Sequence, residues 1–372
     1  MAIVADGIRQ QYREWWDCKN KDALMFVTYP KPGRKTPEEM NLVKPWMDGH
    51  TEWIFARAIG RAYADGDMRP VEDAVRVMAL ELENEAYAGA GYPAVTLNSG
   101  AGCVAAIISE YARYYAETVW FELDEPWSYE KIRGLPADCT TRFAEVTLEA
   151  VKLAAKHLGG SAVISQLDLG GLADVLSSLR RTDGFLYDMK DRPEDVKAAL
   201  EIIQAIWKHW HDRVETELDK ANGGLHTSWV RALSDTVYYP SQCDACAMIS
   251  PEMFREFIMP TLSKEFNFYE RTAYHLDGSG EIPHLGIMCE EPALAAIQWV
   301  PEPAVSHWDE QYHPLYDAII GHGRRIIFNS FKGGPYELKR FLGRFPRESF
   351  LITAHAKDED EAVQWINAGE GK

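Results

Sequence analysis

The sequence predicts a single (β/α)8 barrel, and three observations support this fold class. The chain has 372 residues, which is enough for one large α/β barrel. Short apolar, β-prone runs recur along it and are separated by helix-length amphipathic segments. No low-complexity tract or linker rich in proline, glycine or serine divides the chain. Strands that alternate with helices in this way are typical of a parallel barrel.

The predicted strands are eight runs: 23–27, 94–97, 161–165, 225–229, 272–275, 295–299, 325–329 and 350–354. The helices between them carry their own start and stop signals. Ser250 fits an N-cap, and Pro251 is preorganised for the first helical position. A long amphipathic helix over 193–220 should end at Asn222-Gly223-Gly224. The region 39–88 looks helical, so we expect a cap inserted between the first two strands.

Composition and charge narrow the class of protein. Hydrophobic residues make up 46% of the chain, with 12 Trp, 17 Tyr and 14 Phe to fill a core. A net charge of −18 without a basic stripe argues against nucleic acid as a partner. We expect no transmembrane helix and no signal peptide, because no long apolar run or basic start is present. Six cysteines are too few for a disulfide framework, so we expect a cytoplasmic protein with reduced thiols.

The predicted barrel fixes where an active site should lie. Active sites of such barrels lie at the carboxyl ends of the strands, on the loops that follow. Polar or aromatic residues lie at or just after the ends of the predicted strands, namely Asn98, Asp168, Trp229, His275, Asp277, Gln298, Trp299, Asn329 and His355. Among them we expect Asn98, Asp168, Trp229, Gln298 and Trp299 to form the substrate pocket.

The most informative motif is His275-Leu276-Asp277, which ends a strand and precedes a glycine loop. Side chains two residues apart on a strand point the same way, so His275 and Asp277 should lie side by side. An imidazole and a carboxylate in this arrangement suit metal ligation or proton transfer. The alternative is structural: Asp277 orients His275 or caps the turn that follows.

A second motif is Cys243-Asp244-Ala245-Cys246, which is either a redox dithiol or half of a zinc site. No second CxxC accompanies it. We expect two loop thiols near the mouth, with Asp244 facing the pocket as a catalytic group. A thiolate of Cys243 or Cys246 remains an alternative metal ligand.

Several segments in the same order resemble the uroporphyrinogen decarboxylase superfamily, and the resemblance covers essentially the whole chain. They are Ala101–Ala106, Met248–Phe254, His275–Gly278, Ile297–Pro301 and the last predicted strand, which precedes His355. This superfamily also contains cobalamin-dependent methyltransferases that act on methylated small molecules and thiols. The decarboxylase branch implies an arginine-rich N-terminal motif for substrate carboxylates, but 26–32 reads FVTYPKP without arginine. The chain is therefore more similar to the corrinoid-dependent methyltransferases than to true uroporphyrinogen decarboxylase.

The methyltransferase branch implies zinc held by a His-x-Cys pair and a later cysteine. His275 matches the family histidine, while Asp277 and His355 stand at the two cysteine positions. A set of His275, Asp277 and His355 is competent to bind zinc or another divalent ion, but it is less thiophilic.

The resemblance implies methyl transfer between a small methylated substrate and cobalamin, which a separate corrinoid protein would carry. It also implies a homodimer by analogy. Two alternatives stay open. One is a metal-independent decarboxylase or lyase with His275 and Asp277 as acid and base. The other is a barrel that only binds a tetrapyrrole or another small molecule.

Overall fold

The computed structural model describes residues 3–47, 53–115 and 118–372, and it is a mixed α/β structure with a central, mostly parallel sheet. The sheet has the order β2 (Glu85–Gly89), β1 (Leu24–Pro30), β11 (Phe350–His355), β10 (Arg325–Phe328), β9 (Ala296–Val300), β8 (Arg271–Asp277) and β7 (Tyr238–Gln242). Only the β1–β2 pair is antiparallel. Parallel neighbours place the carboxyl ends of β7 to β11 along one edge.

Two shorter sheets complete the strands of the described residues. The strands β3 (Ala94–Val95) and β6 (Val163–Ile164) pair in parallel, and β4 (Arg113–Tyr114) pairs antiparallel with β5 (Val119–Trp120). A backbone hydrogen bond of 3.2 Å from Gln166 N–H to the Thr227 carbonyl joins the end of β6 to the segment between α9 and β7.

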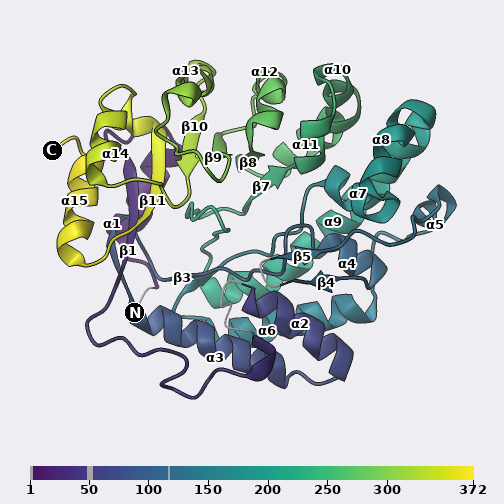
Figure 1. Cartoon of the computed structure of the whole chain (residues 1–372), viewed down its shortest axis with the longest axis horizontal. Helices are drawn as coiled ribbons and strands as arrows, with labels where there is room; N and C mark the ends of the chain where they lie inside the picture. Colours follow the sequence, from purple (N-terminus) through teal and green to yellow (C-terminus); the bar gives the residue numbers. More distant parts are fainter. Residues whose placement is uncertain (1–2, 48–52, 116–117) are drawn as a thin grey trace.

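Helices cover the outer side of the strands (Figure 1). The longer ones are α1 (Asp6–Trp16), α2 (Ile54–Asp65), α3 (Arg69–Asn84), α4 (Val104–Ser109), α5 (Tyr129–Arg133), α6 (Arg142–Leu158), α7 (Leu172–Arg180), α8 (Thr182–Asp191), α9 (Pro193–Asn222), α11 (Met259–Phe266), α13 (His313–Gly321), α14 (Pro335–Leu342) and α15 (Glu359–Gly369). Shorter turns include the 3₁₀ helices η2 (Asp244–Met248) and η4 (Ser279–His284), α10 (Pro251–Met253), the π-helical turn η3 (Phe254–Ile258) and α12 (Leu285–Met288). None of the helices in the described residues is long and apolar enough to cross a membrane.

The helix signals of the sequence are confirmed where the structure tests them. The Ser250 hydroxyl accepts a hydrogen bond from Met253 N–H, and Pro251 occupies the first turn of α10. The helix α9 ends at Asn222, and Gly223 follows with φ of 65°. Glycine adopts this left-handed conformation without the steric cost that a Cβ would bring.

Alternate residues along the strands enter two different apolar clusters, as a period of two requires. The outer cluster packs against the helices and includes Tyr274, Leu276, Ile297 and Trp299. The inner cluster receives residues from eight strands, which are Leu24 and Phe26, Ala94, Val163, Tyr238, Ala273, Ala296, Ile327 and Leu351. Tyr12, Trp15 and Trp16 of α1 join this inner cluster, so α1 closes one end of it. Both faces of these strands are therefore buried.

Seven of the eight predicted strands are present in whole or part, but 225–229 is not a strand. Within it, His226 forms only an isolated antiparallel bridge with Ser234. The strand that follows α9 is β7, which was not among the predicted strands and which contains Pro240. Proline is tolerated because β7 is the last strand of its sheet and pairs on one side only, with β8.

The region 39–88 is helical in α2 and α3, which pack against α6, as expected for most of the predicted insertion. Its residues 48–52 lie outside the described residues. Its last residues were predicted wrongly, because Glu85–Gly89 forms β2 and pairs antiparallel with β1. This pairing gives the backbone of β1 a hydrogen-bonding partner on its second side, which a helix could not provide.

Candidate metal centre

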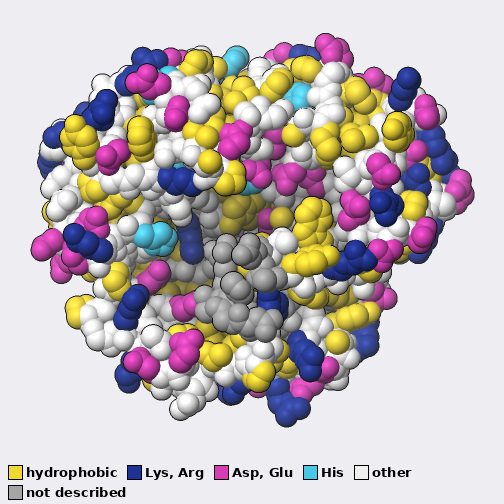
Figure 2. All heavy atoms as spheres, viewed as in Figure 1, with side chains coloured by type: hydrophobic (Ala, Val, Ile, Leu, Met, Phe, Trp, Pro, Cys, Tyr) yellow, Lys and Arg dark blue, Asp and Glu magenta, His cyan; other side chains and the backbone are white. Residues whose placement is uncertain are grey.

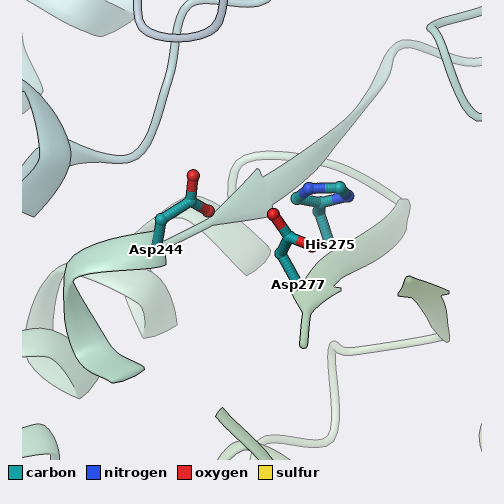
Figure 3. A group of neighbouring side chains, drawn as sticks. All are labelled: Asp244, His275 and Asp277. Carbon is teal, nitrogen blue, oxygen red and sulfur yellow. The ribbon is translucent and has the colours of Figure 1, made fainter. Parts of the chain in front are cut away.

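Three side chains at the carboxyl ends of two neighbouring strands form the candidate site. Asp244, His275 and Asp277 each offer one ligand atom, and these atoms all lie within 4.8 Å of one another. The three side chains point toward a common space (Figure 3). The expectation that His275 and Asp277 share a face is confirmed, and Asp244 joins them from the neighbouring strand.

Strand register explains this meeting. The strands β7 and β8 run parallel with Gln242 paired to His275. The chain leaves β7 at Gln242 and enters η2 at Asp244, so this carboxylate lies over the end of β8. Residues far apart in sequence thus meet because parallel strands end at the same edge.

The ring of His275 is held in a defined orientation. Its Nδ1 lies within hydrogen-bond distance of Gln298 Oε1, from the facing position of β9. A carbonyl oxygen only accepts, so Nδ1 carries the proton and Nε2 keeps a lone pair for a metal or a substrate proton. The indole of Trp229 contacts the same ring edge-on, with centroids 6.3 Å apart.

The position of Asp244 depends on a residue that the sequence did not reveal. Asp174, in the first turn of α7, accepts backbone hydrogen bonds from Asp244 N–H (3.1 Å) and Ala245 N–H (2.7 Å). These bonds satisfy the start of η2 and fix where its first side chain emerges. No local sequence signal links Asp174 to residues seventy positions later, so only the fold could identify it.

Negative charge accumulates around this group. Burial raises the pKa of Asp168 to about 6, nearby Asp244 adds to the rise, and His275 opposes it. Gln242 Nε2 donates to Asp168 Oδ1 over 2.9 Å and holds this carboxylate beside the group. Desolvation also raises the pKa of Asp244, with His275 opposing the rise and Asp277 adding to it. Carboxylates crowded in this way gain from a cation that neutralises them.

A cavity of about 1340 Å³ adjoins the site, and Asn98, Asp168, Trp229 and His355 line it as the sequence analysis expected. The face seen in Figure 2 is hollowed near the centre of the view, with acidic side chains along part of the upper rim. Asp168 and Trp229 connect the two features, because both line the cavity and both act directly on His275.

Gln298 and Trp299, which were both predicted to line the pocket, lie on opposite faces of β9. Gln298 points to the inner side beside His275 and is 1% exposed. Trp299 belongs to the outer cluster, where it packs against Tyr312 and is fully buried. Its prediction as a pocket wall is therefore wrong, because adjacent residues of a strand cannot share a face.

His355 does not join the group of three ligands. It ends β11, which β9 and β10 separate from β8 in the sheet, and its Nδ1 lies 2.6 Å from Thr28 Oγ1. His355 does line the cavity. In the described part of the chain, the ligand group therefore contains Asp244 where the sequence analysis expected His355.

The two cysteines of the CxxC motif lie in the core. The sequence analysis expected them on a loop at the mouth, so this prediction is wrong. Cys243 is 1% exposed and Cys246 is fully buried, and both are free thiols. A hydrogen bond with Cys246 and burial raise the pKa of Cys243, so its thiol stays protonated. Metal ligation requires the thiolate. Neither cysteine belongs to a ligand group among the described residues.

The donor set fits a divalent cation. Two carboxylate oxygens and one imidazole nitrogen suit zinc, manganese or ferrous iron, and three ligands leave positions open for water or substrate. Protein bonds to zinc are about 2.0–2.2 Å long, so ligand atoms within 4.8 Å of one another need only a small contraction around an ion.

No protein-family model matches this chain, and none of the curated proteins matches it either. The chemistry of the site and the resemblance of the sequence segments are therefore the grounds on which a function is proposed.

Proposed function

We propose that this protein is a metal-dependent enzyme that transfers a methyl group between a small methylated substrate and cobalamin on a corrinoid protein. The observation that carries the metal is the group of Asp244, His275 and Asp277 beside a large cavity. The methyl transfer rests on the resemblance to corrinoid-dependent methyltransferases. A bound divalent ion would supply Lewis acidity toward the substrate atom that carries the methyl group.

We also propose that eight of the strands close into a (β/α)8 barrel. The inner apolar cluster supports closure, because β1, β3, β6, β7, β8, β9, β10 and β11 all contribute residues to it. In an open sheet, strands at opposite ends would not share one interior. The candidate site then lies at the carboxyl ends of the strands, where barrel enzymes act.

The residues of this chain would divide the work at the site. Asp244 and Asp277 supply negative charge, and His275 supplies Nε2 because Gln298 engages Nδ1. Asp168 presents an acceptor to hydroxyl or N–H groups of the substrate, and Trp229 covers one side of the His275 ring. A set of oxygen and nitrogen ligands prefers oxygen to sulfur at its open position. The favoured substrate is thus a methyl ether, and its alkoxide leaves, whereas thiol activation is disfavoured.

Metal analysis tests the first half of this proposal. We expect about one zinc, manganese or iron ion per purified chain, and at least a tenfold loss of metal affinity in Asp277→Ala. His355→Ala is the matched control, because His355 lines the same cavity without joining the ligand group. Methyl transfer from aryl or alkyl methyl ethers to added cob(I)alamin, followed by absorbance, tests the second half.

An active enzyme without metal would contradict the proposal and support a metal-independent lyase or decarboxylase. The orientation of His275 by Gln298 favours this alternative specifically, since it also suits a general acid or base. A protein that binds small molecules but shows no turnover, with or without metal, would instead be a binding barrel.

A further inference from the structure

A tight hairpin lies between α9 and β7 and projects into the inner cluster. His226 and Ser234 exchange both backbone hydrogen bonds over 2.9 Å, and Arg231 N–H donates to the Ser228 carbonyl at the tip. Four apolar residues of the hairpin belong to the inner cluster, namely Leu225, Val230, Ala232 and Leu233. The hairpin is therefore packed in place, although sequence analysis took its first half for a strand.

Arg231 has a strained backbone at the tip of this hairpin. Its φ is 59°, in the left-handed region that residues with a Cβ rarely adopt. Such a conformation costs about 1 kcal/mol or more and persists when the surrounding structure imposes it. Here the hydroxyls of Tyr12 and Tyr92 donate to the Arg231 carbonyl and hold the peptide in place.

The side chain of Arg231 lies beside the Phe26 ring at the wall of the large cavity. Its Cζ lies 5.9 Å from the centre of the Phe26 ring, and Arg231 lines the cavity together with Phe26, Tyr87 and Trp229. Burial raises the pKa of Tyr92, and the positive charge of Arg231 opposes that rise. The charge thus lies among aromatic side chains, on a side chain that is half-buried.

No acidic side chain neutralises Arg231 within the described residues. Its Nη1 is fully buried and has no hydrogen-bond partner there. Arg325, which is a buried arginine, differs: its two Nη atoms donate to the Glu348 carbonyl and Asn20 Oδ1. Arg231 as a whole is half-buried, so its charge is partly desolvated while part of the side chain stays open to the cavity that it lines. A partly desolvated cation without an acidic partner favours an anionic ligand in that cavity.

We propose that Arg231 binds a carboxylate group of the substrate, which is a monocarboxylic acid with a planar apolar body. This inference rests on the proposed function, whose substrate it specifies. One half-buried guanidinium matches a single negative charge and the fork geometry of a carboxylate. The cations Arg34, Lys35 and Lys357 also line the cavity but are exposed, so a phosphate dianion would lack a second half-buried cation. Phe26 and Trp229 provide flat apolar surfaces for the body of the acid.

The hairpin also relates this carboxylate site to the metal group. Trp229 lies two residues before Arg231 and contacts the His275 ring, while Asn329 Nδ2 donates to the Trp229 carbonyl over 3.1 Å. A rigid tip thus carries the anion-binding group next to the residue that covers the metal ligand. An acid held by Arg231 would extend along Trp229 toward the open positions of the metal.

Titration calorimetry with sodium 4-methoxybenzoate and the uncharged 4-methoxybenzyl alcohol tests this inference on the full chain. We expect the acid to bind more tightly than the alcohol, and Arg231→Met to weaken binding of the acid by about 10- to 100-fold. The affinity for the alcohol should change little. Arg231→Lys should recover part of the loss, and Lys357→Met is the matched control that removes an exposed cation from the same cavity.

The variant Arg231→Gly distinguishes the effect of the Arg231 charge on binding from its effect on the stability of the fold. Glycine relieves the left-handed strain, so this variant should unfold at the same or a higher temperature while losing affinity for the acid. Equal losses for acid and alcohol in Arg231→Met, or no binding of the acid to the parent protein, would overturn the inference. Repeating the titration after metal removal keeps the two proposals distinct, because binding to Arg231 should persist without metal even if methyl transfer fails.

Discussion

Glu281 shows how one buried side chain beside the candidate site links the fold to pH. It is fully buried in η4, where its Oε1 accepts Asp277 N–H and Tyr274 O–H lies 2.9 Å from its Oε2. Burial raises the pKa of Glu281 from 4.5 to about 11, and the neighbouring Cys246 and Asp244 add to the rise. At neutral pH this carboxyl is therefore protonated in the folded protein, whereas it is ionised in the unfolded chain.

The sign of the pH dependence follows from this difference. The folded state binds one more proton than the unfolded state between the two pKa values, so the contribution of Glu281 to stability falls as pH rises from about 4.5 to 11. Glu281→Gln keeps a neutral group of the same shape. We expect it to raise the free energy of unfolding at pH 8 and to remove a slope of up to about 1.4 kcal/mol per pH unit.

Urea unfolding at a series of pH values measures this effect. Glu270→Gln is a control, since Glu270 lies outside the buried network, just before β8. A variant Glu281→Gln that retains the full pH slope, or that is less stable at pH 8, would contradict a neutral Glu281. Metal affinity serves as a second readout, because Glu281 holds the backbone of Asp277.

Single residues also show which parts of the site a sequence can predict. His275 and Asp277 were predictable because a period of two places them on one face regardless of the neighbours. Trp299 was wrongly predicted to line the pocket, because the sequence did not show which residues of β9 face inward. Moving along a strand by one residue exchanges the two faces. No sequence motif pointed to Arg231. Its proposed role depends on its backbone conformation and on the absence of an acidic partner, and both are features of the folded structure.

At the scale of elements, the short helix η2 is held in place by a side chain of another helix, α7. The side chain of Asp174 on α7 accepts hydrogen bonds from two backbone N–H groups of η2, and Asp174 is not one of the three residues of the ligand group. Burial raises the pKa of Asp174 to about 7, and the nearby Asp244 contributes to the rise. Asp174 is thus a positioning residue for Asp244.

We expect Asp174→Ala to weaken metal binding by about 10- to 100-fold, as loss of supporting contacts around metal ligands commonly does. The fold should remain, because only the start of η2 loses its partners. Chelator competition measures the affinity, and circular dichroism checks the fold. Asp183→Ala on α8 is the control, because this carboxylate is 73% exposed. Unchanged metal affinity in Asp174→Ala would show that Asp244 is positioned by its own backbone or does not bind metal.

Individual helices and strands were easier to predict than the pairing of strands and other contacts between distant segments. Seven predicted strands, the end of α9 and the start of α10 followed from local pattern, because burial on two faces and capping act within a few residues. The strands β2 and β7 did not, because β2 is defined by pairing with β1, and Pro240 is tolerated only at a sheet edge. The hairpin over 226–234 looks like a strand locally and becomes a turn through non-local bonds to Tyr12 and Tyr92.

At the scale of the whole molecule, α1 links the closed end of the interior to the ligand cavity. Tyr12, Trp15 and Trp16 fill the inner cluster from one end, and Trp16 Nε1 donates to the Leu233 carbonyl of the hairpin over 2.9 Å. The Trp16 ring also packs edge-on against Tyr238 of β7, with centroids 5.5 Å apart. The same residue therefore supports a strand of the site and the hairpin that carries Arg231.

Trp16→Ala should consequently affect both stability and ligand binding. Truncation of a buried aromatic side chain costs about 3–5 kcal/mol in the free energy of unfolding, and the lost bond to Leu233 loosens the hairpin. We expect weaker binding of 4-methoxybenzoate, whereas metal affinity should change less because the ligand group rests on β7, β8 and α7. Trp120→Ala is the matched control, since that indole is 56% exposed. Stability that falls without any loss of carboxylate affinity would show that the hairpin holds Arg231 independently of α1.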